Sequence, residues 1–329
     1  MKILITGGAG YIGSHTAYKL IKAGHTVTIL DNLEKGQQAT LDTLRTVAGE
    51  FTFIQADLRN FTELSQKLAA LTFDTVIHFA AYIEVGRSAS EPEQFFENNT
   101  MGSLNLFKVL LEKNIAKIVF SSTAAVYKPK NELLKESDEL KPESPYGESK
   151  LLTERILESL SKFRGLQVII LRYFNPAGAI AGLVGEKHLP ETHLIPRLLR
   201  SLLSPEFKFT VYGNDYATTD GTCLRDFLHI EDLVDAHLAA LKMEKDFAIY
   251  NVGTGIGTSV KQVITTAEKV TGQKINYNIV ARRSGDADIL VADPAKIQEE
   301  LGWQAKFALE EIIRSAWEYE QIRPEADYQ

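Results

Sequence analysis

The first thirteen residues, MKILITGGAGYIG, constrain the fold of this chain more than any other stretch. Lys2 to Thr6 is a short apolar run with β-branched residues, and a helix-like stretch from Tyr11 to Lys22 follows the glycines. The glycines also fit the pattern G-x-G-x-x-G from Gly8, and three of them lie three residues apart: Gly7, Gly10 and Gly13. The order strand, tight turn, helix is the one that a dinucleotide-binding site needs.

Each glycine has a physical role in such a site. The first allow a turn that a Cβ would block, the middle one lets the backbone approach a pyrophosphate, and the last lets helix pack on strand. The phosphates then meet N–H groups at a helix N-terminus. Asp31 ends the next apolar strand, Thr26 to Leu30, and its carboxylate would accept hydrogen bonds from ribose hydroxyls and repel a 2′-phosphate. The context favours an NAD site over a flexible glycine loop that binds no ligand.

Further apolar runs alternate with helix-like stretches up to about residue 175. The expected strands are Phe51–Ala56, Thr75–Phe79, Lys117–Phe120 and Val168–Leu171. This alternation predicts an α/β fold, a doubly wound parallel sheet of the Rossmann type. The rhythm changes afterwards, so we expect an NAD-binding domain at 1–175, with returns to the sheet near 230–253, and a smaller mixed α/β substrate-binding domain at 176–329.

Composition excludes several classes of function. The 329 residues carry a net charge of −7 without a basic run, which gives no reason to expect a nucleic-acid partner. The single cysteine, Cys223, cannot form an internal disulfide, and it is better explained as a packed small residue than as a nucleophile. No apolar stretch reaches membrane-span length, and the N-terminal apolar run is too short for a signal peptide. We therefore expect a cytoplasmic protein without a membrane partner.

The segment from Ser144 to Lys150 carries the candidate catalytic groups. Ser144 suits an N-cap and Pro145 a first helical turn, so Tyr146 and Lys150 should lie four residues apart on one helix face. A nearby ammonium and a cationic nicotinamide would favour the phenolate of Tyr146, which then takes a proton from a substrate hydroxyl. Thr123, at a strand end, would relay that proton or hold the substrate oxygen. The alternative is an exposed Tyr and Lys on a solvated helix.

Several motifs together resemble the extended short-chain dehydrogenase/reductase family. They include T-G-G-A-G-Y-I-G, L-D-N-L, H-F-A-A, F-S-S-T-A-A-V-Y, S-P-Y-G-E-S-K and R-Y-F-N-P-A-G-A. Within that family the chain resembles the UDP-glucose 4-epimerases, through G-N-D-Y, D-G-T-C-L-R-D-F-L-H-I-E-D-L and A-R-R-S-G-D. The resemblance covers essentially the full length.

The resemblance implies a tightly held NAD that is not consumed and a UDP-hexose substrate. The sugar's C4 hydroxyl would be oxidised, the 4-keto sugar would rotate, and hydride would return to its opposite face. The implied catalytic residues are Tyr146, Lys150 and Thr123. The implied cofactor-binding residues are Gly7, Gly10, Tyr11, Ile12, Gly13, Asp31, Asn32, Asp57, Leu58, Phe79, Ala80, Ala81, Asn98, Tyr146, Lys150 and Tyr173.

The residues implied on the substrate side come from both halves of the chain. They are Thr123, Tyr146, Asn99, Asn175, His193, Leu194, Tyr212, Arg225, Arg283, Asp286 and Leu290. Guanidinium groups also suit a diphosphate on chemical grounds. The alternative for the two arginines is ordinary surface ion pairing with Asp226 and Asp286. The resemblance further implies a homodimer formed by two amphipathic stretches, Glu91–Lys113 and Pro145–Phe163, although a face of either can equally pack on the chain's own sheet.

Three positions depart from the family pattern. Ile83 stands where many members carry a lysine, which removes or replaces one cofactor contact. Thr123 stands where many have Ser and keeps the hydroxyl. Leu290 stands where a Tyr often restricts bulky 2-acetamido groups, so other UDP sugars such as UDP-N-acetylglucosamine or UDP-glucuronate stay open as substrates.

Two further functions and a metal site are less well supported. A nucleotide-sugar 4,6-dehydratase would need acidic groups where Ala124 and Ala125 stand. A regulator that binds NAD without turnover would not need Tyr146 and Lys150. We expect no metal at the histidines and glutamates around Pro190, because that proline breaks the helical spacing that would aim two imidazoles at one ion; these residues are Glu186, His188, Glu191 and His193.

Overall fold

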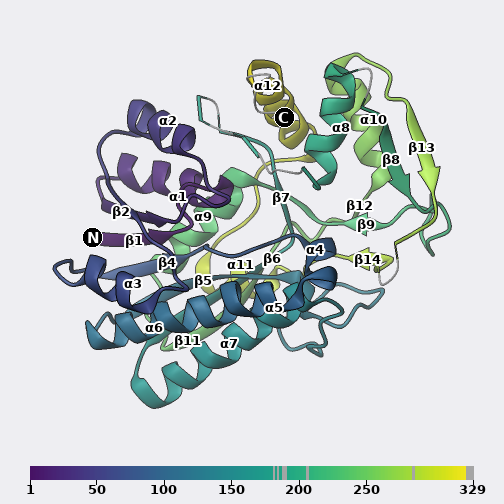
Figure 1. Ribbon diagram of the computed structural model, residues 1–329. Coiled ribbons are helices and arrows are strands. Elements are labelled where there is room, and N and C mark those ends of the chain that lie inside the picture. The colour runs from purple at the N-terminus through teal and green to yellow at the C-terminus, as the bar shows by residue number, and fades with distance from the viewer. Residues whose placement is uncertain (181, 184, 187–190, 205–206, 284–285, 324–329) are drawn as a thin grey trace.

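The computed structural model describes residues 1–180, 182–183, 185–186, 191–204, 207–283 and 286–323. Within them, seven parallel strands form the main sheet in the order β11-β6-β5-β4-β1-β2-β3 (Figure 1). Their bounds are β1 Lys2–Thr6, β2 Thr26–Asp31, β3 Thr52–Gln55, β4 Thr75–His78, β5 Lys117–Thr123, β6 Gln167–Tyr173 and β11 Phe247–Val252. The predicted doubly wound fold class is confirmed.

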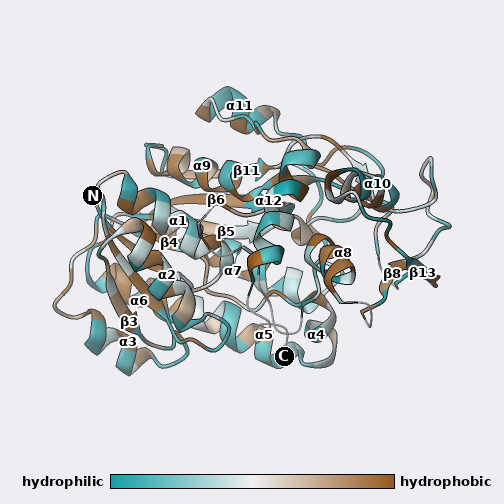
Figure 2. Ribbon diagram, turned by 90° about the horizontal axis from the view of Figure 1, so that it is seen from above, coloured by the Kyte–Doolittle hydropathy of each residue, from teal (hydrophilic) through white to brown (hydrophobic). Residues whose placement is uncertain are grey.

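Helices cover both faces of this sheet because the side chains of each strand alternate between two cores. Ile3 and Ile5 pack in one core and Leu4 in the other. The first core is shared with α1 (Tyr11–Lys22), α2 (Gln38–Ala48), α9 (Ile230–Leu241) and α11 (Ala295–Leu301). The second is shared with α3 (Phe61–Leu68), α6 (Gly102–Glu112) and α7 (Pro145–Arg164). Figure 2 shows hydrophobic residues along the strand β6 and mostly hydrophilic ones on α11 at the periphery.

The C-terminal elements gather beyond the carboxyl ends of the strands (Figure 1). α8 (Leu194–Leu203), α10 (Val260–Thr271) and α12 (Leu309–Ile322) enclose a third core with β8 (Phe209–Tyr212), which pairs with β13 (Tyr277–Val280). Three short strands form a second small sheet: β9 (Leu224–Arg225), β12 (Thr258–Ser259) and β14 (Ile289–Leu290). β7 (Asn175–Ala177) pairs with β10 (Phe227–His229) and leads the chain from the main sheet toward this part.

The predicted returns to the sheet take two forms. Ile230–Leu241 is the helix α9 on one face of the sheet, whereas the predicted run Ile249–Val252 lies inside the edge strand β11, which pairs with β6. The amphipathic stretch from Glu91 to Lys113 is not one regular helix. It divides into α5 (Pro92–Phe95), a π-helical turn η1 (Phe96–Met101) and α6. The remaining short elements are α4 (Val85–Ser90) and the 3-10 turn η2 (Ala124–Val126).

Among the described residues, no helix combines the length and apolarity needed to cross a bilayer.

Candidate active site

The glycine loop between β1 and α1 is held by close backbone packing. Gly7 has a φ of +72°, and a Cβ on it would lie 2.7 Å from the Ala80 nitrogen. A Cβ on Gly13 would lie 2.2 Å from the Gly7 oxygen, so neither position has space for a side chain. A Cβ on Gly10 would have only that same oxygen near it, at 3.4 Å. Gly10 also caps α1 without a side-chain hydrogen bond. The start of α1 therefore fits a phosphate group.

Asp31 lies beside this loop at the end of β2. Its carboxylate accepts hydrogen bonds from the Ala9 and Leu33 amides at 3.0 and 2.9 Å. Burial raises the pKa of Asp31, and the two amides oppose that rise. Because the carboxylate is fixed against the glycine loop, it is placed where a ribose would follow a phosphate bound at α1.

The exits of β3 and β4 lie at the same carboxyl edge of the sheet as the glycine loop, where parallel α/β sheets bind their ligands. Asp57 accepts hydrogen bonds from Arg59 and, at 2.9 Å, from Asn32, and these bonds hold its pKa at about 2 against the effect of burial. The buried Leu58 packs near Gly102, where an added Cβ would lie 3.3 Å from the Leu58 Cβ. At the end of β4, the Phe79 ring lies 4.8 Å from the His237 ring. Ala80 follows it against the glycine loop.

The candidate base lies at the start of α7, as the sequence predicts. The Ser144 hydroxyl accepts a hydrogen bond from the Gly147 amide at 3.1 Å, and Pro145 opens the helix. The side chain of Thr123, the last residue of β5, neighbours the Tyr146 hydroxyl. Burial raises the pKa of Tyr146 to about 12, and the interaction with Thr123 acts against that rise. The residues of the chain alone therefore keep this phenol protonated at neutral pH.

Lys150 is buried one helical turn after Tyr146. Its ammonium donates to the Ser121 carbonyl oxygen at 2.8 Å and lies 4.9 Å from the centre of the Phe120 ring. Burial lowers the pKa of Lys150 to about 7, and Glu154 acts in the opposite direction. Lys150 is 3% exposed. The alternative of a solvated lysine on an exposed helix face is therefore excluded for Lys150.

A buried ion pair that the sequence analysis did not identify joins the elements carrying these groups. Arg172 on β6 donates to both carboxylate oxygens of Glu154 on α7, from Nε at 3.0 and 3.2 Å. Ser122 on β5 donates to the same carboxylate. Glu154 lies four residues after Lys150, and this helical spacing could have indicated that Glu154 lies on the same helix face. The pair fixes α7 against the ends of β5 and β6.

The two predicted asparagines lie in the π-helical turn η1. Asn99 is buried, and its amide is bonded to the main chain of Tyr82 on both sides, accepting from the nitrogen at 2.7 Å and donating to the oxygen at 3.0 Å. It also donates to the Ser149 hydroxyl at 3.0 Å. Asn98 donates to Asn99. On the facing strand, the hydroxyls of Tyr173 and Ser121 are hydrogen-bonded.

The other predicted substrate residues fall on the second part of the molecule. Arg225 on β9 forms an ion pair with Asp286, which also accepts from the Tyr216 hydroxyl at 2.9 Å. The Arg283 guanidinium lies 4.0 Å from the centre of the Tyr212 ring. Hydrogen bonds from Arg283 and Arg197 lower the pKa of Tyr212. A cleft of about 540 Å³ lies beside these groups, lined by Arg282, Arg283 and Asp286 and, opposite, by Lys130 and Glu143.

Two further predicted positions lie near this side. The Asn175 side-chain oxygen is buried and has no hydrogen-bond partner, which suits an acceptor kept for a ligand. Leu290 on β14 is in register with Arg225 and packs at the edge of a small core around Tyr127. Of the two alternative ion pairs, the one with Asp286 is formed by Arg225, whereas the buried Asp226 carboxylate accepts from Thr254, Gly255 and Ala292 instead of pairing with an arginine.

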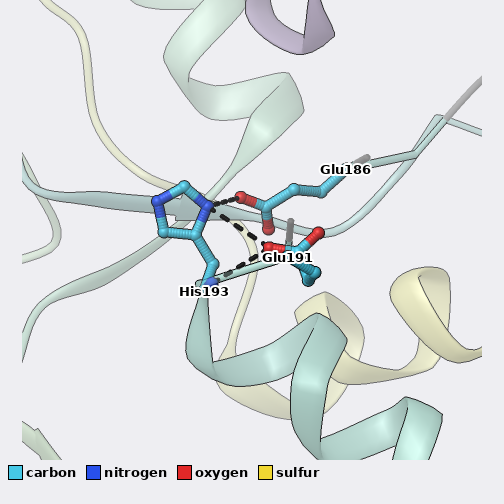
Figure 3. A group of neighbouring side chains, drawn as sticks. All are labelled: Glu186, Glu191 and His193. Atoms are coloured by element: carbon cyan, nitrogen blue, oxygen red, sulfur yellow. Dashed lines mark hydrogen bonds and ion pairs between the residues drawn. The ribbon is translucent and has the colours of Figure 1, made fainter. Parts of the chain in front are cut away.

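His193 precedes α8 and faces two glutamates (Figure 3). Its Nδ1 lies 2.6 Å from Glu186 and 3.8 Å from Glu191, and the three groups offer ligand atoms within 4.8 Å of one another. Burial acts to lower the pKa of His193, but the Glu186 carboxylate outweighs it and the pKa rises to about 9. An imidazolium is not a metal ligand, so this arrangement favours an ion pair. His188 lies outside the described residues, and the absence of a metal stays a prediction.

Comparison with known proteins identifies the family. The model of the NAD dependent epimerase/dehydratase family matches residues 3–253. The chain belongs to this family. A UDP-glucose 4-epimerase from Halalkalibacterium halodurans is 43% identical over 98% of the chain and 97% of its own length. One from Lactobacillus helveticus is 41% identical, with 98% of each chain covered.

Solved structures of family members resemble this one closely. The UDP-glucose 4-epimerase from Bifidobacterium longum, in complex with NAD⁺ and UDP, superimposes with a TM-score of 0.94 at 34% identity, covering 100% of both chains. The UDP-Glc/GlcNAc 4-epimerase from Campylobacter jejuni gives a TM-score of 0.84 at 39% identity, covering 97% of this chain and 99% of its own. The similarity to these epimerase structures therefore covers essentially the whole chain. The assignment of individual residues to ligand contacts stays a prediction.

Proposed function

We propose that the protein is an NAD-dependent UDP-glucose 4-epimerase that interconverts UDP-galactose and UDP-glucose. The observation that carries this proposal is the placement of Tyr146 beside Thr123 at the exit of β5, one helical turn from the buried Lys150 and on the same sheet edge as the glycine loop. This is a proton acceptor for a hydroxyl beside a dinucleotide crevice. The full-length likeness to UDP-glucose 4-epimerases supports the choice of reaction.

The side chains around β5 handle the proton of the sugar's C4 hydroxyl. Tyr146 accepts that proton while Thr123 holds the oxygen, and Tyr146 returns it after the 4-keto sugar has turned over in the pocket. The glycine loop, the N-terminus of α1 and Asp31 would hold NAD, which would supply a reversible hydride acceptor for C4. Lys150 favours the phenolate by its charge, and the carbonyl of Ser121 fixes its position. A cationic ring beside Tyr146 would lower the pKa that burial has raised.

The fit of the chain to the cofactor rests on its crevice. Gly7 and Gly13 leave no space for a side chain, the N-terminus of α1 faces it, and the Asp31 carboxylate is fixed beside it. On the substrate side, Arg225, Arg283 and His193 offer positive charge to the two phosphates of the uridine diphosphate. Asn175 offers its unpartnered buried oxygen to a hydroxyl of the ligand.

We further assign the NAD-binding domain to residues 1–175 with the returns near 230–253, and the substrate-binding domain to 176–329. We place the protein in the cytoplasm as a homodimer joined through the stretches Glu91–Lys113 and Pro145–Phe163. Two exposed apolar side chains in these regions, Met101 and Phe163, support an interface there.

A 4-epimerase of another UDP sugar is the second candidate. Leu290 leaves more space than a tyrosine would, and the related enzyme from Campylobacter jejuni is described as acting on both UDP-Glc and UDP-GlcNAc. A 4,6-dehydratase is disfavoured because Ala124 and Ala125 follow Thr123 and supply no acid. A regulator without turnover is disfavoured because it would gain nothing from Tyr146 and Lys150 at this position.

The test is to incubate the purified protein with UDP-galactose, without added NAD, and to identify the products by proton NMR. We expect UDP-glucose to form. The control is Tyr146→Phe, which should retain NAD but react about 10²–10⁴-fold more slowly. Unchanged UDP-galactose, with NAD released on heating, would redirect the assignment to UDP-N-acetyl sugars or UDP-glucuronate. A protein that holds no NAD would contradict the proposal outright.

A further inference from the structure

An ion pair joins the two segments that follow the neighbours of β1 in the sheet. Lys35 lies in the loop after β2 and Glu84 in the segment after β4, and the Lys35 nitrogen is 2.6 Å from a Glu84 oxygen. In the sheet, β1 lies between β4 and β2. The pair therefore spans the carboxyl end of β1, where the glycine loop begins.

Both partners are anchored to the glycine loop. Next to Lys35, the main chain packs on Ala9: a Cβ on Gly36 would lie 2.7 Å from the Ala9 Cβ, and the Gln37 amide donates to the Ala9 oxygen at 3.3 Å. On the other side, the segment leading to Glu84 begins at Ala80, whose nitrogen touches Gly7. The ammonium of Lys35 is thus held close to the glycine loop that precedes α1.

Glu84 is fixed more firmly than Lys35. The Glu84 side chain is 12% exposed and accepts a hydrogen bond from the Ile83 amide at 3.2 Å. Burial opposes its ionisation, but the bond from Lys35 and those from backbone amides outweigh burial, so its pKa lies below the ordinary value. A second cation, Arg87, stays 4.0 Å away and is bonded to Glu91. Glu84 therefore acts as an ionised anchor for the ammonium.

Lys35 keeps bonding capacity for a ligand. An ammonium has three N–H donors, and Glu84 engages one of them at 2.6 Å. The side chain is 41% exposed, so the remaining donors are open to a ligand. A helix N-terminus contributes only about half a positive charge, which leaves a diphosphate undercompensated. Ile83, beside Glu84, contributes no charge.

We propose that Lys35 is the side-chain cation that binds the diphosphate of the dinucleotide, with Glu84 holding its ammonium across the crevice. This inference rests on the proposed NAD site and names a residue outside the sequence-predicted set. Lys35 is a binding residue and takes no part in proton transfer. Removing the Lys35 side chain should weaken the binding of every ligand that carries the diphosphate and leave the binding of a bare nucleoside unaffected.

The experiment uses full-length protein from which retained NAD has been removed, and measures its dissociation constants for NADH by fluorescence titration and for ADP and adenosine by displacement of NADH. Lys35→Met should weaken NADH and ADP at least about tenfold, because a charge-assisted contact is lost, and change adenosine less than about twofold. Lys35→Arg should keep ADP binding. The matched control is Lys269→Met, which breaks an ion pair of the same 2.6 Å length with Glu310 on the exposed surface and should change no constant.

A second variant tests whether Lys35 contacts the phosphates or only joins the two loops through its ion pair with Glu84. Glu84→Gln breaks the ion pair but leaves the Lys35 charge, so ADP affinity should stay within about threefold of the wild type or increase. Equal losses in Lys35→Met and Glu84→Gln would overturn the inference, as would an unchanged ADP constant in Lys35→Met. Both results presuppose a wild type that binds NADH. A wild type that binds none would refute the proposed function itself.

Discussion

Lys150 donates its ammonium to the carbonyl oxygen of Ser121, two residues before Thr123 on the same strand. The bond couples the charge that should favour a tyrosinate to the strand that supplies the hydroxyl partner of Tyr146. Because the ammonium is buried without a carboxylate in direct contact, its proton is weakly held, with a pKa of about 7.

The first prediction follows from that pKa. In NAD-free protein, the folded state loses the Lys150 proton near pH 7, whereas the unfolded chain keeps it to about pH 10.4. The unfolded state binds more protons between these values, so this group makes the protein more stable as pH rises. The free energy of unfolding of the wild type, relative to Lys150→Met, should increase from pH 7 to 10 by at most about 5 kcal/mol. Urea denaturation of both proteins at several pH values measures it, and a flat difference would show that Lys150 is not desolvated.

The second prediction concerns the buried pair of Arg172 and Glu154. Glu154→Gln leaves a guanidinium that is 1% exposed without a counter-charge and should cost about 3–5 kcal/mol of unfolding free energy. The double variant Glu154→Leu with Arg172→Met removes both charges and should recover at least half of that loss. Denaturant titration compares the free energies of unfolding of the wild type, the single variant and the double variant. Additive losses in the double variant would mean that the pair is not an energetic unit.

The third prediction separates two glycines of one loop. Gly13→Ala forces a Cβ to 2.2 Å from the Gly7 oxygen and should destabilise the fold by about 1–3 kcal/mol. Gly10→Ala meets no backbone closer than 3.4 Å, so it should cost less than about 1 kcal/mol while lowering NAD binding. Thermal unfolding and NADH titration report the two effects. Equal NADH affinity in Gly10→Ala would place the diphosphate away from this residue.

The fourth prediction addresses the breadth of substrates. Leu290→Tyr adds bulk beside Arg225 and should lower turnover of UDP-N-acetylglucosamine at least about tenfold, with UDP-galactose turnover within about threefold. Leu290→Met, which conserves volume, is the control. Product analysis by NMR for both sugars checks the ratio. A parallel loss for both sugars would show that this position does not select at C2.

Local sequence signals were sufficient for the fold and for the placement of the candidate base on its helix. The glycine spacing predicted the observed bounds of β1 and α1, and the i, i+4 spacing predicted that Tyr146, which is half-buried, and the buried Lys150 share a helix face. Contacts between distant segments could not be predicted this way. Glu154 and Arg172 are 18 residues apart on different elements, and Lys35 and Glu84 are 49 apart.

Protonation was the other quantity beyond the reach of the sequence. The pattern indicated a tyrosine activated by a lysine, but the high pKa of Tyr146 and the low pKa of Lys150 come from burial, which depends on how the whole core closes around them. The same holds for His193, whose proton is retained because the fold brings Glu186 to it.

The side-chain amide of Asn99 links the segment after β4 to the helix α7, which carries Tyr146 and Lys150. It holds the main chain of Tyr82, two residues before Glu84, and the hydroxyl of Ser149, the neighbour of Lys150. Loosening the crevice rim to release a dinucleotide therefore disturbs the helix that handles the proton. Enzymes that must exchange their cofactor at each turnover would be slowed by such a linkage. A redox-neutral cycle, which leaves its dinucleotide as it found it, has no need to open that rim between one substrate and the next.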